Sequence, residues 1–514
     1  MINLLILASL GLCHLILRPI FVYFKDEKNL RRFPAPSVAG FTNLWSANNF
    51  RKGRRSLEVH KAHQRLGPVI RIQPEHISFN LPAAVTDIYG FSTKVQKDPF
   101  YNTFTGNEYT SIVGTRSREE HARKRKYISN AFAQKNILDM EPIIQQQVAT
   151  FLTKMDSFCS PSPSDNKGVP VGRTFHNVRR WLNLFTFDVI GAAAFGKPMG
   201  FLEQGDDLAP AETWDGKRYH THAIRSFHTN SRYDVILAHW PKLLWLTKRL
   251  TQWHPGNKGG ADFTALTIRK VRERKVSGKP AGYTDFFHHL LQDRNGKDVG
   301  LSIFELEKEA GVMINAGSDT TTTAMTHCLY YLIRNPPVLK KLREELDTVL
   351  GGQTTAARYE QVKDLKYLRA CLDEAMRLRP PTSLGLPRIT PPEGATIAGY
   401  HIAGDVTISV PTYTLHRNPE LFSDPETYRP ERWLDEVEGP RCRTYVLPFS
   451  TGPRACIGRN LAYLEQQILI ATLAHRYDWC FESDNLELST IERFNANPAD
   501  MWVKLWRREP NVQA

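Results

Sequence analysis

The alternation of apolar and polar residues predicts a chain built mainly from helices. Apolar positions recur at helical spacing in seven long stretches. These stretches are residues 119–133, 141–156, 174–195, 264–274, 304–334, 338–350 and 368–378. Residues 67–80 instead alternate β-branched and polar side chains between turn signals, which predicts a short hairpin. The pattern therefore predicts a mainly α protein with small β-sheets.

Three polar stretches rich in proline, glycine, serine and charge are expected to form surface loops. They are residues 159–172, 203–216 and 251–262. None of them has the composition of a domain linker, and no repeat of fixed period occurs in the 514 residues. One folded domain over residues 46–514 is the expected organisation, although a chain of this length could hold two or three average domains.

The first 24 residues are apolar enough to predict a membrane anchor. Residues 2–17 are apolar apart from three positions, and the apolar character resumes after Arg18 and Pro19. A cleaved signal peptide is the alternative, but no basic segment precedes the run. The lysines and arginines that follow place the main body on the cytosolic side. Residues 25–45, basic and rich in proline, are expected to form a hinge.

Charge and cysteine content narrow the classes of protein. The formal net charge of +14 fits an acidic protein partner, anionic lipid or nucleic acid. No nucleic-acid-binding motif is present, so we expect no nucleic-acid partner. The seven cysteines are scattered without metal-binding spacing. They therefore indicate a reducing compartment rather than a disulfide framework or a zinc site.

One cysteine, Cys456, stands in an unusual setting within the stretch FSTGPRACIG at residues 449–458. Gly452 and Gly458 let the backbone pass close to a flat macrocycle and direct amide groups at the sulfur. Arg454 can reach an anionic carboxylate. With Phe449, this spacing resembles the haem-thiolate signature of the cytochrome P450 family, in which a cysteine thiolate ligates the iron. The alternative is a small buried cysteine in an ordinary turn.

The resemblance implies a buried structural ion network upstream of the cysteine. Glu374 and Arg377 share one helix face at the i, i+3 spacing, and Arg432 in the PERW segment is the expected third member. The same spacing recurs at Glu120/Arg123, Glu426/Arg429 and Glu438/Arg441. Only the first pair is followed by two prolines and then by the PERW segment, which selects it.

The long helix predicted at residues 304–334 contains a further motif, Ala316-Gly317-Ser318-Asp319-Thr320. A glycine in mid-helix costs about 1 kcal/mol relative to alanine, so Gly317 indicates close packing or a bulge over a flat group. By the resemblance, Ala316 and Gly317 would border the cofactor, and Thr320 and Asp319 would deliver protons. The alternative is a threonine-rich helix with ordinary backbone hydrogen bonds.

Donors for the two haem propionates are expected from two parts of the chain besides the cysteine loop's own Arg454. His121 and Arg125, one helical turn apart, resemble the family's propionate-binding helix, with His121 where many members carry tryptophan. Arg388 resembles a further contact from a strand. The alternative for each of these side chains is a solvated surface charge.

The resemblance covers nearly the whole chain and implies a cytochrome P450 fold with haem b between the Thr320 helix and the Cys456 loop. Such a protein would be a monooxygenase anchored in the endoplasmic reticulum membrane, using O2 and electrons from NADPH–cytochrome P450 reductase, with cytochrome b5 as a further electron donor. No GxGxxG fingerprint follows a strand, so the reductant would be a separate protein. The sequence is most similar to fungal microsomal members, including the benzoate para-hydroxylase-like group, which implies a lipophilic substrate of secondary or aromatic metabolism.

Other readings remain open at this point. The same cofactor supports oxidative coupling, epoxidation or rearrangement, and a haem- or sterol-binding membrane protein without turnover is a remote alternative. Substrate contacts are expected from five stretches with few motifs, namely residues 101–112, 201–232, 314–316, 381–386 and 493–500.

Overall fold

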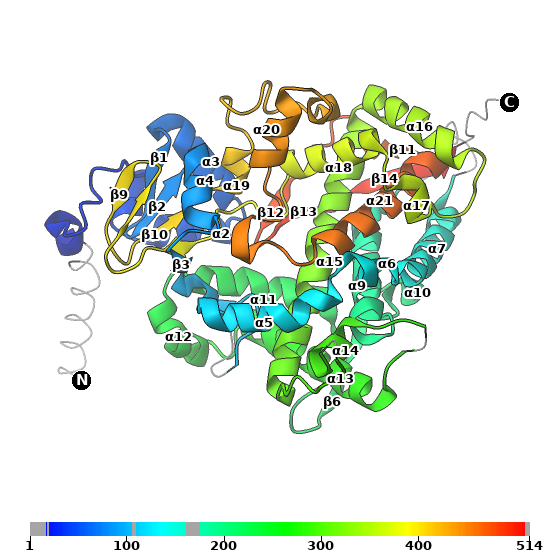
Figure 1. The fold of residues 1–514 in the computed structure, drawn as a ribbon, viewed down its shortest axis with the longest axis horizontal. Helices are drawn as coiled ribbons and strands as arrows, with labels where there is room; N and C mark the ends of the chain where they lie inside the picture. The colour runs from blue at the N-terminus through cyan, green and yellow to red at the C-terminus, as the bar shows by residue number, and fades with distance from the viewer. Residues whose placement is uncertain are drawn as a thin grey trace.

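Helices dominate the structure. The computed structural model describes residues 17, 20–104, 109–160, 175–280, 282–293 and 295–508. Over these residues the strands form five small, separate sheets, and the largest lies at one end of the molecule, beside the N-terminal segment (Figure 1). The prediction of a mainly α protein with small β-sheets is therefore confirmed.

A long helix, α15 (Ile303–Arg334), runs through the middle of the molecule (Figure 1). It packs against α9 (Val178–Phe195), α18 (Lys366–Leu378) and α21 (Arg459–Arg476). Its start is fixed by a capping box, in which Ser302 and Glu305 each accept the other's backbone amide. This start and the helix's unbroken length give α15 a fixed position against its three neighbours.

Shorter helices surround this centre. The further α-helices of the described residues are α2 (Leu44–Arg51), α3 (Arg55–Leu66), α4 (Pro82–Tyr89), α5 (Arg118–Ala131), α6 (Gln134–Leu138), α7 (Glu141–Phe158), α10 (Phe201–Gln204), α11 (Ala223–Leu237), α12 (Leu244–Leu250), α13 (Pro255–Ser277), α14 (Phe286–Leu291), α16 (Pro336–Leu350), α17 (Tyr359–Val362), α19 (Thr412–Leu415) and α20 (Glu438–Tyr445). Short 3₁₀ turns are η1 (Ser37–Gly40), η2 (Pro99–Phe104), η3 (Pro241–Leu243), η4 (Pro430–Trp433) and η5 (Gly452–Arg454).

The largest sheet has the strand order β1-β2-β10-β7-β3. Its strands are β1 (Val69–Gln73), β2 (His76–Phe79), β10 (Thr407–Ser409), β7 (Arg388–Ile389) and β3 (Gln96–Lys97). Strands β1 and β2 form the hairpin predicted at residues 67–80. Strand β3 pairs antiparallel with β7 so that Lys97 lies opposite Arg388. Side chains directly opposite each other in such a pair share one face of the sheet, so two cations meet here.

The other sheets are small. A three-stranded sheet has the order β11 (Tyr477–Phe481), β14 (Trp502–Arg507), β4 (His176–Asn177). Three hairpins complete the set: β5 (Leu208–Glu212) with β6 (Arg218–His222), β8 (Ala395–Ile397) with β9 (Tyr400–Ile402), and β12 (Thr490–Glu492) with β13 (Ala496–Pro498).

Two large apolar cores hold the molecule together. The larger core joins the helices around α15, and the second joins the largest sheet to α4, α19 and the segment around Trp433. Residues of both cores line one interior cavity, for example Ile190 and Leu461 from the first and Tyr89 and Val410 from the second. The cavity therefore lies between the two cores.

Two of the loop predictions are partly wrong. Residues 251–262 include the first two turns of α13, where Pro255 occupies the first turn and the His254 side chain accepts the Gly256 amide. Gly259 and Gly260 do not mark a turn here. A Cβ on Gly259 would lie 2.5 Å from the Ser226 carbonyl oxygen, so these glycines allow close packing against α11.

The second error concerns residues 203–216, which contain β5 and most of its hairpin turn. Alternate residues of β5 are buried, and Glu212 at its end pairs with Arg218 across the strands. The local proline and glycine content concealed this strand, because the pairing partner lies beyond the stretch.

The predicted anchor, residues 1–24, lies mostly outside the described residues. In the part of the chain that the structure covers, no helix is both long enough and apolar enough to cross a bilayer. Residues 25–45, expected as a hinge, pack on the domain: Leu30 and Phe33 belong to the second core, and the Pro34 carbonyl accepts the Arg71 amide at 2.8 Å.

Candidate active site

The segment before α21 presents Cys456 to the cavity. Gly452 has a φ of +70°, and a Cβ at this position would collide with the Tyr89 carbonyl oxygen at the end of α4. Glycine is therefore required here by both backbone conformation and space. The Cys456 amide donates to the Phe449 carbonyl oxygen at 2.8 Å, and the Phe449 ring packs on Tyr463 of α21. These contacts hold the Cys456 side chain exposed toward the cavity.

The sulfur of Cys456 faces backbone donors. Burial raises the pKa of the Cys456 thiol, and the amide groups of Gly458 and Arg459, which hydrogen-bond the sulfur, act in the opposite direction, as does the charge of Arg125. Gly458 has ordinary room around it, since a Cβ there would meet its nearest atoms at 3.9 Å. Its amide donates to the sulfur, as that of any residue except proline could at this position.

The four predicted cations converge on the same cavity. His121 and Arg125 come from α5, Arg388 from β7, and Arg454 from η5. Arg125 donates to the Ala455 carbonyl oxygen at 2.8 Å, and Arg454 donates to the carbonyl oxygens of Thr115, Arg116 and Ser117. These bonds fix both guanidinium groups relative to the cysteine loop.

A fifth cation, Lys97, was missed by the sequence reasoning. It lies opposite Arg388 in the sheet, is 7% exposed, and donates to the Val113 carbonyl oxygen at 2.5 Å. A two-residue strand leaves almost no periodic signal, so only its pairing with β7 identifies the residue. Lys97 adds a buried amino group, whose pKa burial lowers well below its ordinary value, to the four side chains that were predicted.

His121 is neutral at pH 7, whereas the three arginines and Lys97 bring positive charge to the cavity. Within the described ranges, none of them forms a salt bridge with a carboxylate. Burial and the charges of Arg454, Lys97, Arg125 and Arg388 lower the pKa of His121 to about 3. Burial and Arg388 likewise lower the pKa of Arg454 to about 10. Such a cluster is stable only with anions beside it, so these side chains fit the two propionates of a haem.

Helix α15 lies across the cavity and remains regular through the predicted motif. Ala316 is exposed toward the cavity in spite of its central position in the helix. A Cβ on Gly317 would lie 2.6 Å from Cδ1 of Ile190 in α9, so this glycine serves close packing rather than a bulge. The Thr320 hydroxyl donates to the Ala316 carbonyl oxygen at 2.8 Å and lines the cavity.

Asp319 is buried and held by three partners. His228 of α11 donates to Oδ1 at 2.8 Å, and Asn497 and Asn495 of the β12–β13 hairpin donate to Oδ2 at 2.5 and 3.3 Å. Although burial acts in the opposite direction, His228 and Asn497 hold the pKa of Asp319 well below its ordinary value. Asp319 is thus an ionised carboxylate tied to α11 and the hairpin, which the sequence did not reveal.

The predicted ion network is present and fully buried. Arg377 donates to both carboxylate oxygens of Glu374 at 2.9 Å, and Arg432 donates to Oε1 at the same distance. Trp433 adds an indole donor at 3.0 Å. All three charged side chains are completely shielded from solvent, and the two arginines lower the pKa of Glu374 against the effect of burial.

Sequence reasoning misjudged Glu438, which it treated as one half of a coincidental pair. Glu438 forms an ion pair with Arg432 and another with Arg429, so it belongs to the network. Glu120 and Arg123, in contrast, form an exposed pair on α5, as expected for a coincidental spacing.

The cavity has a volume of about 710 Å³ and extends from Cys456 past α15 to α11 and α13. All five stretches from which substrate contacts were expected contribute to its lining. They supply Tyr101, Thr103, Phe104, Ser111, Ile112, Phe227, Asn230, Ser231, Asn315, Ala316, Pro381, Thr382, Leu386, Arg493, Phe494, Asn495 and Asn497.

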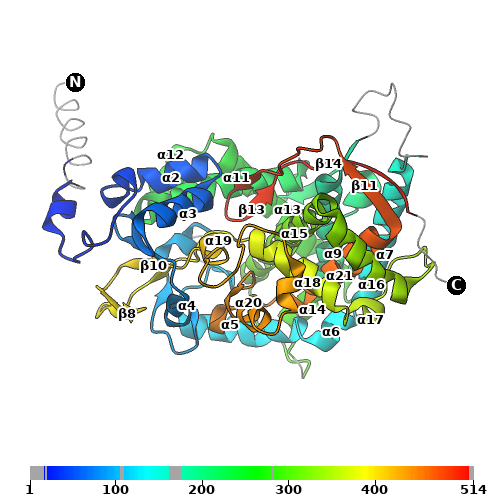
Figure 2. The same cartoon turned by 90° about the horizontal axis from the view of Figure 1, so that it is seen from above.

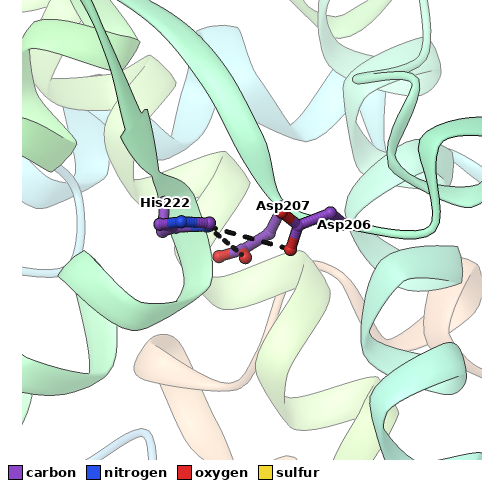
Figure 3. A group of neighbouring side chains, drawn as sticks. All are labelled: Asp206, Asp207 and His222. Atoms are coloured by element: carbon purple, nitrogen blue, oxygen red, sulfur yellow. Dashed lines mark hydrogen bonds and ion pairs between the residues drawn. The ribbon is translucent and has the colours of Figure 1, made fainter.

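One other cluster has metal-binding residue types in the described part of the chain: Asp206, Asp207 and His222 (Figure 3). His222 contacts Asp207 at 3.0 Å, Arg180 contacts Asp206 at 3.2 Å, and Asp207 accepts the Ile224 amide at the start of α11. The carboxylates are therefore engaged in linking the hairpin to neighbouring helices.

Comparisons with known proteins identify the class. The family model described as Cytochrome P450 matches residues 34–499. The chain therefore belongs to the cytochrome P450 family.

Among its relatives is benzoate 4-monooxygenase of Aspergillus niger, which is 32% identical over 98% of both chains. A cytochrome P450 monooxygenase of Aspergillus terreus is 29% identical over 90% of this chain and 93% of its own. Averantin hydroxylase of Dothistroma septosporum is 30% identical over 94% of this chain and 85% of its own. This chain is a cytochrome P450 monooxygenase, and its family implies a haem-thiolate cofactor, O2, a small-molecule substrate and a redox partner.

Proposed function

We propose that this monooxygenase binds haem b through the Cys456 thiolate and oxidises, most simply by hydroxylation, a lipophilic small molecule. The observation that supports the proposal is that Cys456 lies in one cavity with three arginines, Lys97 and the neutral donor His121, none of which forms a salt bridge among the described residues. Arg125, Arg388, Arg454, His121 and Lys97 would hold the propionates, and α15 would cover the opposite face. When bound, the haem supplies O2 activation and oxygen transfer.

Two side chains of α15 would handle protons. The Thr320 hydroxyl donates a hydrogen bond to the Ala316 carbonyl oxygen. The lone pairs of the hydroxyl oxygen are therefore free to accept a hydrogen bond from the cavity. Asp319 takes its hydrogen bonds from His228 and two asparagines. In this arrangement His228 Nε2 and the Asp319 carboxylate form a buried polar link from α11 toward Thr320.

Electrons would come from a separate flavoprotein. We propose NADPH–cytochrome P450 reductase, with cytochrome b5 as an additional donor, at the endoplasmic reticulum membrane. The formal charge of +14 suits an acidic protein partner. The apolar run of residues 2–17 suits an anchor with the domain on the cytosolic side.

The deciding experiment is the absorption spectrum of the reduced, carbon-monoxide-bound protein. The wild type should give the red-shifted band of thiolate-ligated haem, and Cys456→Ala should lose it. Cys480→Ala is the matched control, because Cys480 lies on β11, outside the cavity lining, and should leave the band unchanged. A wild-type protein that binds haem without this band would contradict the proposal.

A further inference from the structure

A second group of arginines lies apart from the propionate cations. Arg493 stands in the turn of the β12–β13 hairpin, and the charges of Arg179, Arg232 and Asp319 act on it. None of the five propionate cations is among the charges that act on Arg493. Of these three arginines, Arg493 alone is among the residues that line the cavity. The bound haem would balance the first group of cations and leave this one in place.

Arg493 is held on a rigid support. Its amide donates to the Asn495 carbonyl oxygen at 2.8 Å. The neighbouring Glu492 is buried and accepts the Ser56 amide and hydroxyl of α3, each at 2.6 Å. On the other side of the turn, Asn497 is bound to Asp319. A side chain fixed in this way can orient a ligand with little loss of entropy.

Not every N–H group of the Arg493 guanidinium has a hydrogen-bond partner within the protein. Nη1 donates to Asn497 Oδ1 at 2.9 Å, whereas Nε is buried and has no partner. Asp319 is the carboxylate whose charge acts on Arg493, but its hydrogen bonds come from His228, Asn495 and Asn497, and Arg179 and Arg232 share the same surroundings. Among the described residues Arg493 forms no salt bridge. A guanidinium that lines the cavity, forms no salt bridge and has two further arginines beside a single carboxylate suits an anionic ligand group such as a carboxylate.

Aromatic side chains lie beside this donor. Phe494 follows Arg493 directly, and its ring meets that of Phe104 edge to face at 5.3 Å. Both line the cavity together with Phe227 of α11. The combination of one unpaired cation and an aromatic wall fits a ligand with an apolar, aromatic body and a single negative charge.

We infer that the substrate is a lipophilic aromatic carboxylic acid whose carboxylate is bound by Arg493. The inference rests on the proposed function, because it places this carboxylate in the same cavity that Cys456 faces. Arg493 would thereby be a specificity-determining residue, selecting the anionic acid over its neutral analogues and orienting its apolar body within the cavity.

The test compares matched acids and amides on the purified holoprotein. The probes are benzoate, cinnamate and biphenyl-4-carboxylate, each beside its primary amide, titrated through the ligand-induced shift of the haem absorption band. At least one acid should bind more tightly than its amide. Arg493→Gln should weaken the binding of that acid about 10- to 100-fold, as expected for a charge-assisted pair, and change amide binding less than about threefold.

Two further variants separate the role of Arg493 from general effects. Arg493→Lys should recover part of the acid binding. Arg232→Gln, which removes an exposed arginine of the same group outside the cavity lining, should leave it unchanged. Equal weakening of acids and amides in Arg493→Gln, or no acid preferred over its amide by the wild type, would overturn the inference. The carbon-monoxide spectrum of each variant, measured beside these titrations, reports independently on the proposed haem-thiolate function.

Discussion

The energetic role of a buried carboxylate in this protein depends on whether a positively charged side chain pairs with it. Glu374 and Glu309 are both carboxylates with at most 1% exposure. Glu374 has two arginines to pair with. Glu309 has two hydrogen bonds from one amide, that of Ile112, and a distant lysine at 3.8 Å. The two residues should therefore respond differently to neutralisation.

Glu374→Gln should destabilise the fold strongly. It leaves the buried charges of Arg377 and Arg432 without their partner, and breaking a buried ion pair on one side costs about 3–5 kcal/mol. Urea unfolding measures the loss. The control is Glu120→Gln, which breaks the exposed pair with Arg123 at the same sequence spacing and should cost less than about 1 kcal/mol. Equal costs for the two variants would contradict the structural role of the network.

Glu309→Gln should change the dependence of stability on pH. Burial raises the pKa of Glu309 from its ordinary value of 4.5 to about 7. The folded state therefore holds this proton more tightly than the unfolded state. The stability that it contributes is fully present below pH 4.5 and is lost as the pH rises through about 7.

The variant has no proton to lose at this position. The free energy of unfolding of the wild type should fall more than that of Glu309→Gln between about pH 5 and about pH 8, by about 1–3 kcal/mol. Urea unfolding of both proteins across this pH range measures the difference. Parallel curves for the two proteins would show that residue 309 does not titrate in this way.

The position of helix α15 depends on its packing contacts with neighbouring elements. Gly317 and Gly311 lie on this one helix, yet they face different surroundings. A Cβ at residue 317 would press into Ile190 of α9, whereas one at residue 311 would meet Thr267 at an ordinary 3.6 Å. The same substitution should therefore have opposite effects at the two positions.

Gly317→Ala should be destabilising by about 1–3 kcal/mol, because overpacking outweighs the gain in helix propensity of about 1 kcal/mol. Gly311→Ala, which meets no such contact, should be neutral or stabilising. A double-mutant cycle with Ile190→Ala, which removes the colliding atoms, measures the coupling by thermal unfolding. Additive effects of Gly317→Ala and Ile190→Ala would argue against close packing at this point.

The elements that sequence analysis predicted well are those whose signal is local. The long helix around Thr320 and the hairpin at residues 67–80 each carry their period within their own residues. The start of α13 and the strand β5 were misjudged because a distant partner, α11 or β6, stabilises them. Lys97 was missed for the same reason, because its strand is defined only by pairing with β7, whereas Glu438 lies just six residues from Arg432 and was misjudged as part of a coincidental pair with Arg441.

At the scale of the whole molecule, the cavity separates two apolar cores. Figure 2 shows the chain from above, with the largest sheet at one end and the helices around α15 and α21 toward the other. A haem in this cavity would contact residues from both cores, and its propionates would offset the repulsion among the positively charged side chains there. Cofactor binding should therefore couple the two halves of the fold.

Calorimetry of the protein with and without haem tests this coupling. The haem-bound protein should unfold in one transition, with a midpoint at least about 5 °C above that of the haem-free protein. The haem-free protein should unfold over a broader range, as the two cores lose their common ligand. Superimposable traces for the two forms would contradict the coupling.

The contact between Arg454 and the carbonyl groups of residues 115–117 also bears on how the protein is made. These partners are separated by up to 339 positions along the chain. During synthesis, η2 and α5, which line one side of the cavity, would be made long before the cysteine loop at residues 449–458 emerges from the ribosome. Stable cofactor capture is therefore expected only after the cysteine loop has been synthesised, and a nascent chain released before Gly452 should retain no haem.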